Sequence, residues 1–253
     1  MIKIRKSEDR GLSRLAWLTS RHTFSFGSYY DPAYMGFESL RVINDDIVSP
    51  SGGFGTHAHD NMEVISYVLE GALEHKDSMG NTSVIRPGEV QRLSAGTGIT
   101  HSEYNHSKEQ EVHFLQIWLL PDMQAIPPSY DQKVFDEDEK RGRVSLVASK
   151  TGRAGSVILH QDVDMSVALI DGNEVATYMT SKGRALWVHI ASGGVTMNGH
   201  EMQGGDGAAV VEDVKLTFEK GNKAEVLIFD MEPLAKPKQI SCWLKECSSQ
   251  HLM

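Results

Sequence analysis

Short apolar or alternating segments, separated by glycine, proline, asparagine and aspartate, follow one another along most of the chain. In the first half they predict strands over residues 40–43, 64–69, 90–93 and 112–120. In the second half they predict strands over residues 156–159, 166–170, 185–190, 208–211, 215–218 and 225–229. No long segment with a 3.6-residue period competes with them. Many short strands at this spacing predict a β-sandwich or β-barrel in each half.

A polar linker and a weak internal repeat divide the chain. Between Pro121 and Arg143 lie the pair Pro127-Pro128 and the charged run 136–141, which are typical of a solvated connection. An apolar strand that ends in glycine over residues 64–71 has a counterpart over residues 186–193, and the turn at 86–90 is echoed at 204–208. A duplicated small barrel explains both similarities.

Composition and charge narrow the class of protein. The chain has 253 residues, 40% of them apolar, with 25 Lys and Arg against 34 Asp and Glu, which gives a net charge of −9 at pH 7. These values exclude a disordered chain, and the negative charge argues against nucleic acid or an anionic membrane as a partner. Because no apolar stretch suits a signal peptide or a membrane span, we expect a cytoplasmic protein. Cys242 and Cys247, followed by His251, are interpreted as free thiols.

The strongest chemical signal is the pair His57-Ala-His59, followed some forty residues later by His101-Ser-Glu103. Residues i and i+2 of a strand share one face, so each pair can direct two ligands toward one point. Two such strands facing each other inside a barrel would offer three imidazoles and one carboxylate to a metal ion. Positions would remain open on that ion for a substrate and a small molecule such as dioxygen.

The segments around these pairs resemble the first and second cupin motifs: Gly52-Gly-Phe-Gly-Thr-His57-Ala-His59 through Gly71, and Pro87-Gly88 through Gly96-Thr-Gly-Ile-Thr-His101-Ser-Glu103-Tyr-Asn105. Residues 21–27, 40–46, 68–71, 91–103 and 116–119 are similar to the pirins, a bicupin family, and most of all to bacterial pirins with quercetin 2,3-dioxygenase activity. The resemblance implies an all-β fold of two consecutive cupin barrels of the jelly-roll type. Residues 1–125 would form an N-terminal cupin domain with the metal site, residues 126–233 a C-terminal degenerate cupin domain, and residues 234–253 a tail of unknown role.

In pirins the metal is held by residues that correspond to His57, His59, His101 and Glu103. Generic cupins use instead a first-motif glutamate, which aligns with Glu63; with Glu103 present it would be a fifth protein ligand, so Glu63 is interpreted as supporting the site from outside. Shifting the first motif by the repeat distance places Met179, Ser181 and Ala185 where His57, His59 and Glu63 stand. The second half therefore cannot build the same site, and its isolated histidines His160, His189 and His200 are not expected to bind metal. We expect one metal ion per chain.

The resemblance favours iron as the bound divalent transition metal, although cobalt, nickel, copper, manganese and zinc also suit three imidazoles and one carboxylate. It implies a dioxygenase that opens the ring of a flavonol-like aromatic substrate with O2. Glu103 would serve both as a ligand and as the general base that accepts the proton of the 3-hydroxyl. Candidate apolar wall residues are Phe54, Met62, Tyr67, Tyr104 and Trp118. Two alternatives stay open: a non-catalytic metal-binding regulator with a protein partner, and a cupin isomerase acting on a sugar phosphate, which the absence of a Lys/Arg cluster near His101 disfavours.

Overall fold

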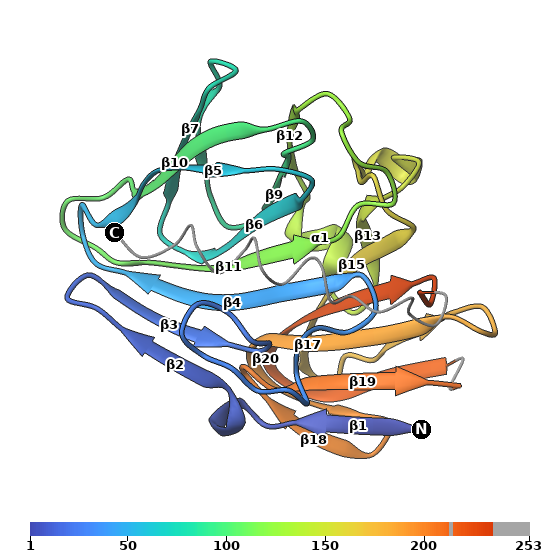
Figure 1. The fold of residues 1–253 in the computed structure, drawn as a ribbon. Helices are drawn as coiled ribbons and strands as arrows, with labels where there is room; N and C mark the ends of the chain where they lie inside the picture. The colour runs from blue at the N-terminus through green and yellow to red at the C-terminus, as the bar shows by residue number, and fades with distance from the viewer. Residues whose placement is uncertain (213–214, 235–253) are drawn as a thin grey trace.

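Residues 1–212 and 215–234 are described by the computed structural model, and almost all of their regular structure is β (Figure 1). The exceptions are one short helix, α1 (Glu137–Lys140), and two single 3-10 turns, Ser7–Asp9 and Arg153–Gly155. Within the described residues the strands form three sheets, of seven, four and nine strands. The predicted all-β class is confirmed.

Two sheets make up the first half of the molecule. The seven-stranded sheet has the order β12-β9-β6-β11-β4-β3-β2, and the four-stranded sheet, with the order β5-β10-β7-β8, lies over its inner face (Figure 1). The strands are β2 (Gly11–Arg14), β3 (Leu18–His22), β4 (Leu40–Val48), β5 (Gly53–His59), β6 (Glu63–Glu70), β7 (Leu73–Asp77), β8 (Thr82–Ile85), β9 (Glu89–Ser94), β10 (Ile99–Asn105), β11 (Val112–Leu119) and β12 (Ser129–Val134).

The second half is built on the nine-stranded sheet, whose main path is β1-β19-β17-β20-β15-β13-β14. Two long strands bend so that β16 pairs with the beginning of β20 and β18 pairs with the end of β17. The strands are β1 (Ile2–Arg5), β13 (Ser145–Ser149), β14 (Val157–Ile158), β15 (Val163–Gly172), β16 (Ala176–Met179), β17 (Ala185–Met197), β18 (His200–Gln203), β19 (Gly207–Val211) and β20 (Lys215–Met231).

The two halves share a strand order. The series β9-β6-β11-β4 in the first corresponds to β19-β17-β20-β15 in the second, with β6 and β17 at equivalent places. These two strands contain the apolar segments that the internal repeat paired, so the repeat reflects a common arrangement. The outer neighbour of β9 is β12, and the outer neighbour of β19 is β1. The edge strand of the second sheet therefore comes from the beginning of the chain.

The large sheets of the two halves pack against each other, and the central strands are consequently apolar on both faces. On β6 and β11, for example, Ile65 and Leu115 belong to a core cluster shared with Trp187 and Phe229 of the second half. Their strand neighbours face the interior of the first half instead, where Val64 and Trp118 form a smaller cluster. Every central strand of this sheet thus has one face toward its partner half and one toward the site.

Two predictions from the sequence need correction or extension. The predicted strands 215–218 and 225–229 are the two ends of a single strand, β20, which continues through the turn-like residues between them because three strands pair with it along its length. The predicted strand 156–159 shortens to the two residues of β14. The predicted domain boundary between residues 125 and 126 stays a prediction. Strand β12 follows this boundary but pairs with β9 of the first half, and β1 precedes it but pairs with β19 of the second half.

A buried ionic group lies between the two large sheets. Asp45 on β4 accepts hydrogen bonds from Arg10 at 3.0 Å and from His113 at 2.6 Å. Although burial alone would raise its pKa, these hydrogen bonds and the charge of Arg10 lower the pKa of Asp45 to about 2. Nearby on β17, His189 is fully buried, and this burial, with the charge of Arg10, lowers its pKa to about 3. His189 is therefore neutral at physiological pH.

We expect Asp45→Asn to lower the free energy of unfolding by about 3 kcal/mol at pH 7, because it leaves the buried Arg10 guanidinium without its counter-charge. Urea unfolding followed by fluorescence measures the change. Asp122→Asn is the matched control, since Asp122 pairs with the half-exposed Lys150 and the loss of this solvent-screened pair should lower the free energy of unfolding much less. Equal losses for the two variants would contradict the prediction.

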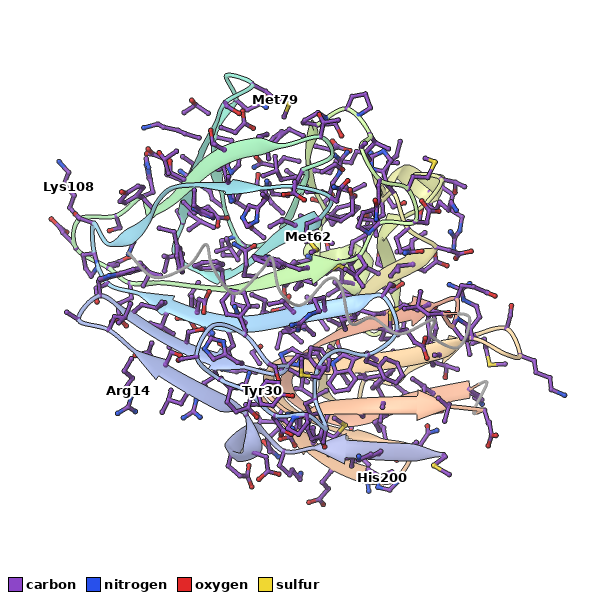
Figure 2. All side chains as sticks on the ribbon, in the orientation of Figure 1. Arg14, Tyr30, Met62, Met79, Lys108 and His200 are labelled. Carbon is purple, nitrogen blue, oxygen red and sulfur yellow. The ribbon has the colours of Figure 1, made fainter. Side chains whose placement is uncertain are left out.

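The low pKa of His189 predicts a specific sensitivity to acid. Below pH 6.5 the unfolded chain binds a proton at this imidazole that the folded chain does not, so stability is lost as the pH falls toward 3. His189→Leu lacks this imidazole and so lacks this loss of stability. The difference between the unfolding free energies of the variant and of wild type should therefore shift in favour of the variant by about 2 to 3 kcal/mol between pH 6.5 and pH 4.5. His200→Leu, at an exposed position of β18 (Figure 2), should run parallel to wild type. Parallel curves for His189→Leu and wild type would refute the assignment.

Candidate metal centre

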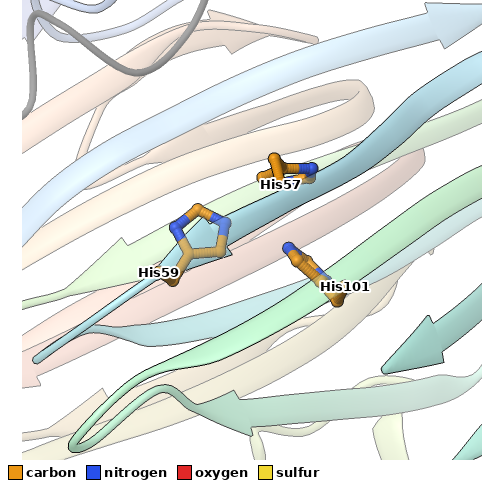
Figure 3. Close-up of side chains that lie close together, drawn as sticks. All are labelled: His57, His59 and His101. Atoms are coloured by element: carbon orange, nitrogen blue, oxygen red, sulfur yellow. The ribbon is translucent and has the colours of Figure 1, made fainter. Parts of the chain in front are cut away.

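Antiparallel pairing of β5 with β10 brings the two predicted histidine segments together. His101 lies directly opposite His57, and His59 lies opposite Ile99. The register shifts by one residue between His101 and Glu103, which is a β-bulge on the β5 side. Figure 3 shows the three imidazoles of His57, His59 and His101 converging from these two neighbouring strands.

The three imidazoles are close enough to share one ion. Their ring centroids are 4.4 to 4.8 Å apart, and one ligand nitrogen from each lies within 4.8 Å of the others. His59 and His101 are buried, while His57 is partly exposed. Converging imidazole nitrogens suit a divalent transition metal, so this donor set fits the ion that the sequence predicts.

A backbone hydrogen bond sets the orientation of the His57 ring. Its Nδ1 lies 2.8 Å from the carbonyl oxygen of Gly55, to which an Nδ1–H group donates a hydrogen bond. Such a bond fixes the tautomer and directs Nε2 toward a metal. Gly55 belongs to the bulged part of β5, so the irregular backbone contributes directly to the site.

The carboxylate of Glu103 is buried and held at both oxygens. Ser66 on β6 donates a hydrogen bond to Oε1 at 2.8 Å, and Gln116 on β11 donates one to Oε2 at 2.5 Å. Its close metal-ligand neighbours are His101 and His75, which with Glu103 form a second group of ligand atoms within 4.8 Å. The structure thus places His57, His59 and His101 in one group, and Glu103 in a second group that shares His101.

A row of buried polar residues crosses the inner face of the large sheet below Glu103. Cross-strand pairs connect them in order: Gln91, Ser66, Gln116, Asn44 and His22. Directly paired residues face the same side of a sheet, so the row presents its amides and hydroxyls to the interior of the first half. It supplies the donors that a buried carboxylate requires.

Another buried carboxyl group stands close by. Burial raises the pKa of Asp46 on β4 to about 7, and the negative charges of Asp45 and Glu103 add to this effect against the opposing hydrogen bond from Ser20. With this pKa, Asp46 is partly protonated near neutral pH, which limits the negative charge beside Glu103.

Glu63 makes a different set of contacts. It is buried on β6, and the backbone N–H of His160 donates a hydrogen bond to its Oε2 at 3.2 Å. The His160 ring also lies 3.0 Å from the Ser94 hydroxyl. Glu63 belongs to neither group of metal-ligand atoms in the described residues. His160, which the sequence left as an isolated histidine, instead connects the second half to β6 and β9.

The candidate wall residues separate into different environments. Trp118 packs its ring edge-on against His59 at 4.9 Å, and Met62 belongs to the same apolar cluster as Trp118. Phe26, which the sequence did not suggest, packs against Trp118 at 5.3 Å. Tyr67 points away from the site into the core between the large sheets, where its hydroxyl bonds to Glu225. Phe54 packs against Trp17 at the other end of the interior, and Tyr104 is exposed.

The second half has no counterpart of the imidazole group among its described residues. Met179 is 62% exposed, Ser181 is exposed, and Ala185 is a buried residue of β17. Met179 and Ser181 line an open cleft of about 570 Å³ in which Arg153 pairs with Asp164 and Arg184 with Asp230. Cys242, Cys247 and His251 lie outside the described residues, as does the tail from residue 235 onward.

His75 is the main residue that the sequence analysis missed. It is fully buried on β7, directly opposite Glu103 of β10, and its Nε2 lies 3.2 Å from Asp77 Oδ2. The signal was present, because His75-x-Asp77 has the same i, i+2 spacing as His101-x-Glu103. Ser66 and Gln116 gave no such signal, since serine and glutamine in a strand carry no distinctive pattern.

Two similarly ordered halves, with a candidate histidine metal centre in the first and no counterpart among the described residues of the second, define a bicupin protein. A Pirin family model matches residues 4–119, and a model described as the quercetinase C-terminal cupin domain matches residues 146–231. The chain belongs to the pirin family, and the predicted bicupin fold is confirmed.

Individual similar proteins support the same assignment. The chain is 43% identical to quercetin 2,3-dioxygenase of Escherichia coli K12 over 92% of its own length and 100% of that protein. It superposes on the E. coli bacterial pirin YhhW, solved in complex with nickel(II), with a TM-score of 0.87 and 42% identity over 92% of this chain and 100% of that one. A quercetin 2,3-dioxygenase from Acinetobacter baumannii, with a TM-score of 0.71 and 18% identity over 90% and 85% of the two chains, shares the fold.

The described part of the chain contains no helix with the length and hydropathy of a membrane span.

The contacts of the two glutamates predict opposite effects on metal binding. Glu63→Gln should retain metal with a loss of affinity of no more than about 10- to 100-fold, because Glu63 binds His160 rather than facing the imidazoles. Glu103→Gln removes the negative charge beside His101 and should weaken binding more. Elemental analysis after dialysis against chelators of increasing strength measures the metal retained by both variants. A Glu63→Gln protein that is empty beside a fully loaded Glu103→Gln protein would reverse the assignment.

Proposed function

We propose that this chain is a metal-dependent dioxygenase that uses O2 to open the ring of a flavonol-like aromatic substrate, the reaction of quercetin 2,3-dioxygenase. One observation carries the proposal: the imidazoles of the two predicted motifs converge on one point, in a chain that is 43% identical to quercetin 2,3-dioxygenase of E. coli. The small-molecule substrate and O2 are the partners that this activity requires.

His57, His59 and His101 would hold one divalent transition metal ion, with Glu103 as the carboxylate ligand. When bound, the ion would supply Lewis-acid chemistry that favours the deprotonated 3-hydroxyl of a flavonol and a place for O2 beside it. The resemblance to pirins favours iron, and the related YhhW structure holds nickel, so the proposal specifies the ion's charge and ligands rather than its element.

The neighbouring side chains suit a flat aromatic substrate. Trp118 and Met62, with Phe26 beside them, offer an apolar surface that begins at the His59 ring. Such a surface would orient the rings of a flavonol by stacking and would exclude water from the reacting carbon atoms. His57, the partly exposed imidazole, marks the side of the group nearest to solvent.

Glu103 would accept the 3-hydroxyl proton as a general base. Its two oxygens are fixed by Ser66 and Gln116, so the carboxylate is oriented before substrate arrives. A proton transferred to one oxygen would require the corresponding donor to turn aside, and the Ser66 hydroxyl can do so by rotation because it can donate or accept. The catalytic role of Glu103 therefore depends on Ser66 and Gln116 as well.

Oxygen consumption by metal-loaded protein with a panel of flavonols tests the proposal. We expect O2 uptake with wild type and loss of nearly all of it with His57→Ala, since one ligand of the group is gone. His200→Ala, at an exposed histidine of the second half, is the control and should keep full activity. Metal-loaded wild type that consumes no O2 with any flavonol would favour a non-catalytic regulator, and turnover of a sugar phosphate without O2 would favour an isomerase.

The pH dependence of Glu103→Gln separates the ligand and base roles. Without the base, turnover at neutral pH should fall by about 10² to 10⁴, and it should recover as the pH approaches the pKa of the free flavonol, because solvent then removes the proton. The measurement is a pH–rate series on metal-saturated wild type and variant, corrected for uncatalysed oxidation. A deficit that is constant with pH would leave Glu103 as a ligand only.

A further inference from the structure

His75 is a buried imidazole that the proposed reaction does not use. It projects from β7 into the interior of the first half, with 0% exposure, and its ring centroid is 5.4 Å from that of His101. Glu103, its direct cross-strand neighbour, is 2% exposed. One ligand atom from each of His75, His101 and Glu103 lies within 4.8 Å of the others, which is the same closeness as in the group of three histidines.

The hydrogen bonding of the two ring nitrogens of His75 is that of a metal ligand. Nε2 lies 3.2 Å from Asp77 Oδ2, so an Nε2–H group donates to this carboxylate, and Nδ1 then carries a lone pair. Nδ1 is buried and has no hydrogen-bond partner in the described residues. A histidine whose one nitrogen donates to a carboxylate while the other carries a lone pair has the usual arrangement of a metal ligand.

We propose that the metal centre has a second, inner position, in which a divalent transition metal is held by His75, His101 and Glu103. Two imidazoles and one carboxylate form a donor set of the kind that iron and its neighbours accept. The outer position is that of His57, His59 and His101, with Glu103 as the carboxylate ligand proposed above. The two positions share His101 and Glu103, and two dications this close would repel each other with one carboxylate between them, so they are alternative positions for one ion.

The two positions differ in their access to solvent. The inner ligands are all buried at 2% exposure or less, whereas the outer group includes the partly exposed His57. An ion in the inner position would be shielded from solvent and from a bulky substrate, and an ion in the outer position would be open to both. The inner position would therefore store the ion in an inactive form, and its occupancy would lower the fraction of protein ready for turnover.

Metal titration of variants without substrate tests this inference, which rests on the proposed metal site but not on its reaction. In the double variant His57→Ala/His59→Ala, Co2+ should still bind at about one equivalent, at least ~10-fold more weakly than in wild type, with a changed visible spectrum. Adding His75→Gln should abolish this binding. Adding His106→Gln instead is the matched control, because His106 is also an imidazole beside a carboxylate, Glu74, but at an exposed position. It should leave binding unchanged.

Because His75 is buried, thermal unfolding must show that each variant is folded. If His75→Gln is not, Asp77→Asn in the double variant provides the second test: it keeps the ring, removes the charge that orients it, and should weaken Co2+ binding on the order of 10- to 100-fold. A folded double variant that binds no Co2+, or one whose binding is indifferent to both His75→Gln and Asp77→Asn, overturns the inner position. In either case O2 uptake by wild type would still support the proposed function.

Discussion

The register between β5 and β10 is the constraint on which the candidate site depends. Because His101 stands opposite His57, side chains 44 residues apart in sequence point into one interior and meet at ring distances below 5 Å. A slip of one residue would turn every one of these side chains to the other face of the sheet. The bulge that follows His101 adds the carbonyl oxygen of Gly55, which orients His57.

The second half supports this register, although none of its described residues belongs to a group of metal-ligand atoms. Its large sheet covers the outer face of β6 and β11, so Ile65 and Leu115 are buried and both strands are fixed between two layers. The inner face of the same strands carries Ser66 and Gln116, which hold Glu103. His160, which binds Glu63 from the second half, adds a polar contact at the same junction. The second barrel thus supports the strands that carry the candidate site of the first.

The sequence predicted what depends on local pattern, and it missed what depends on pairing. Spacing alone indicated His57, His59 and His101, because alternation along a strand holds whatever its partners are. Which strand lies beside β10 is a tertiary property, so His75 was overlooked although it follows the same spacing. The continuity of β20 was missed for a similar reason: the polar residues around Gly221 look like a turn, and Lys220 and Lys223 do have left-handed backbone conformations, but pairing with β15 and β17 on either side continues the strand past them. Ser66 and Gln116 acquire their meaning solely from facing Glu103.

The place of β1 in the second sheet has a consequence for biosynthesis. Ile2–Arg5 pairs with β19, and the amino group of Met1 binds the carbonyl oxygen of Val211, a separation of 210 residues. On the ribosome, β1 emerges well before β19 and waits on the order of ten seconds or more for this partner, because translation proceeds at roughly 5–20 residues per second. During that interval its apolar face and unpaired amides are available to chaperones or to other nascent chains. Completion of the second barrel therefore has to wait until β19 has been translated, so its sheet joins segments made at widely separated times.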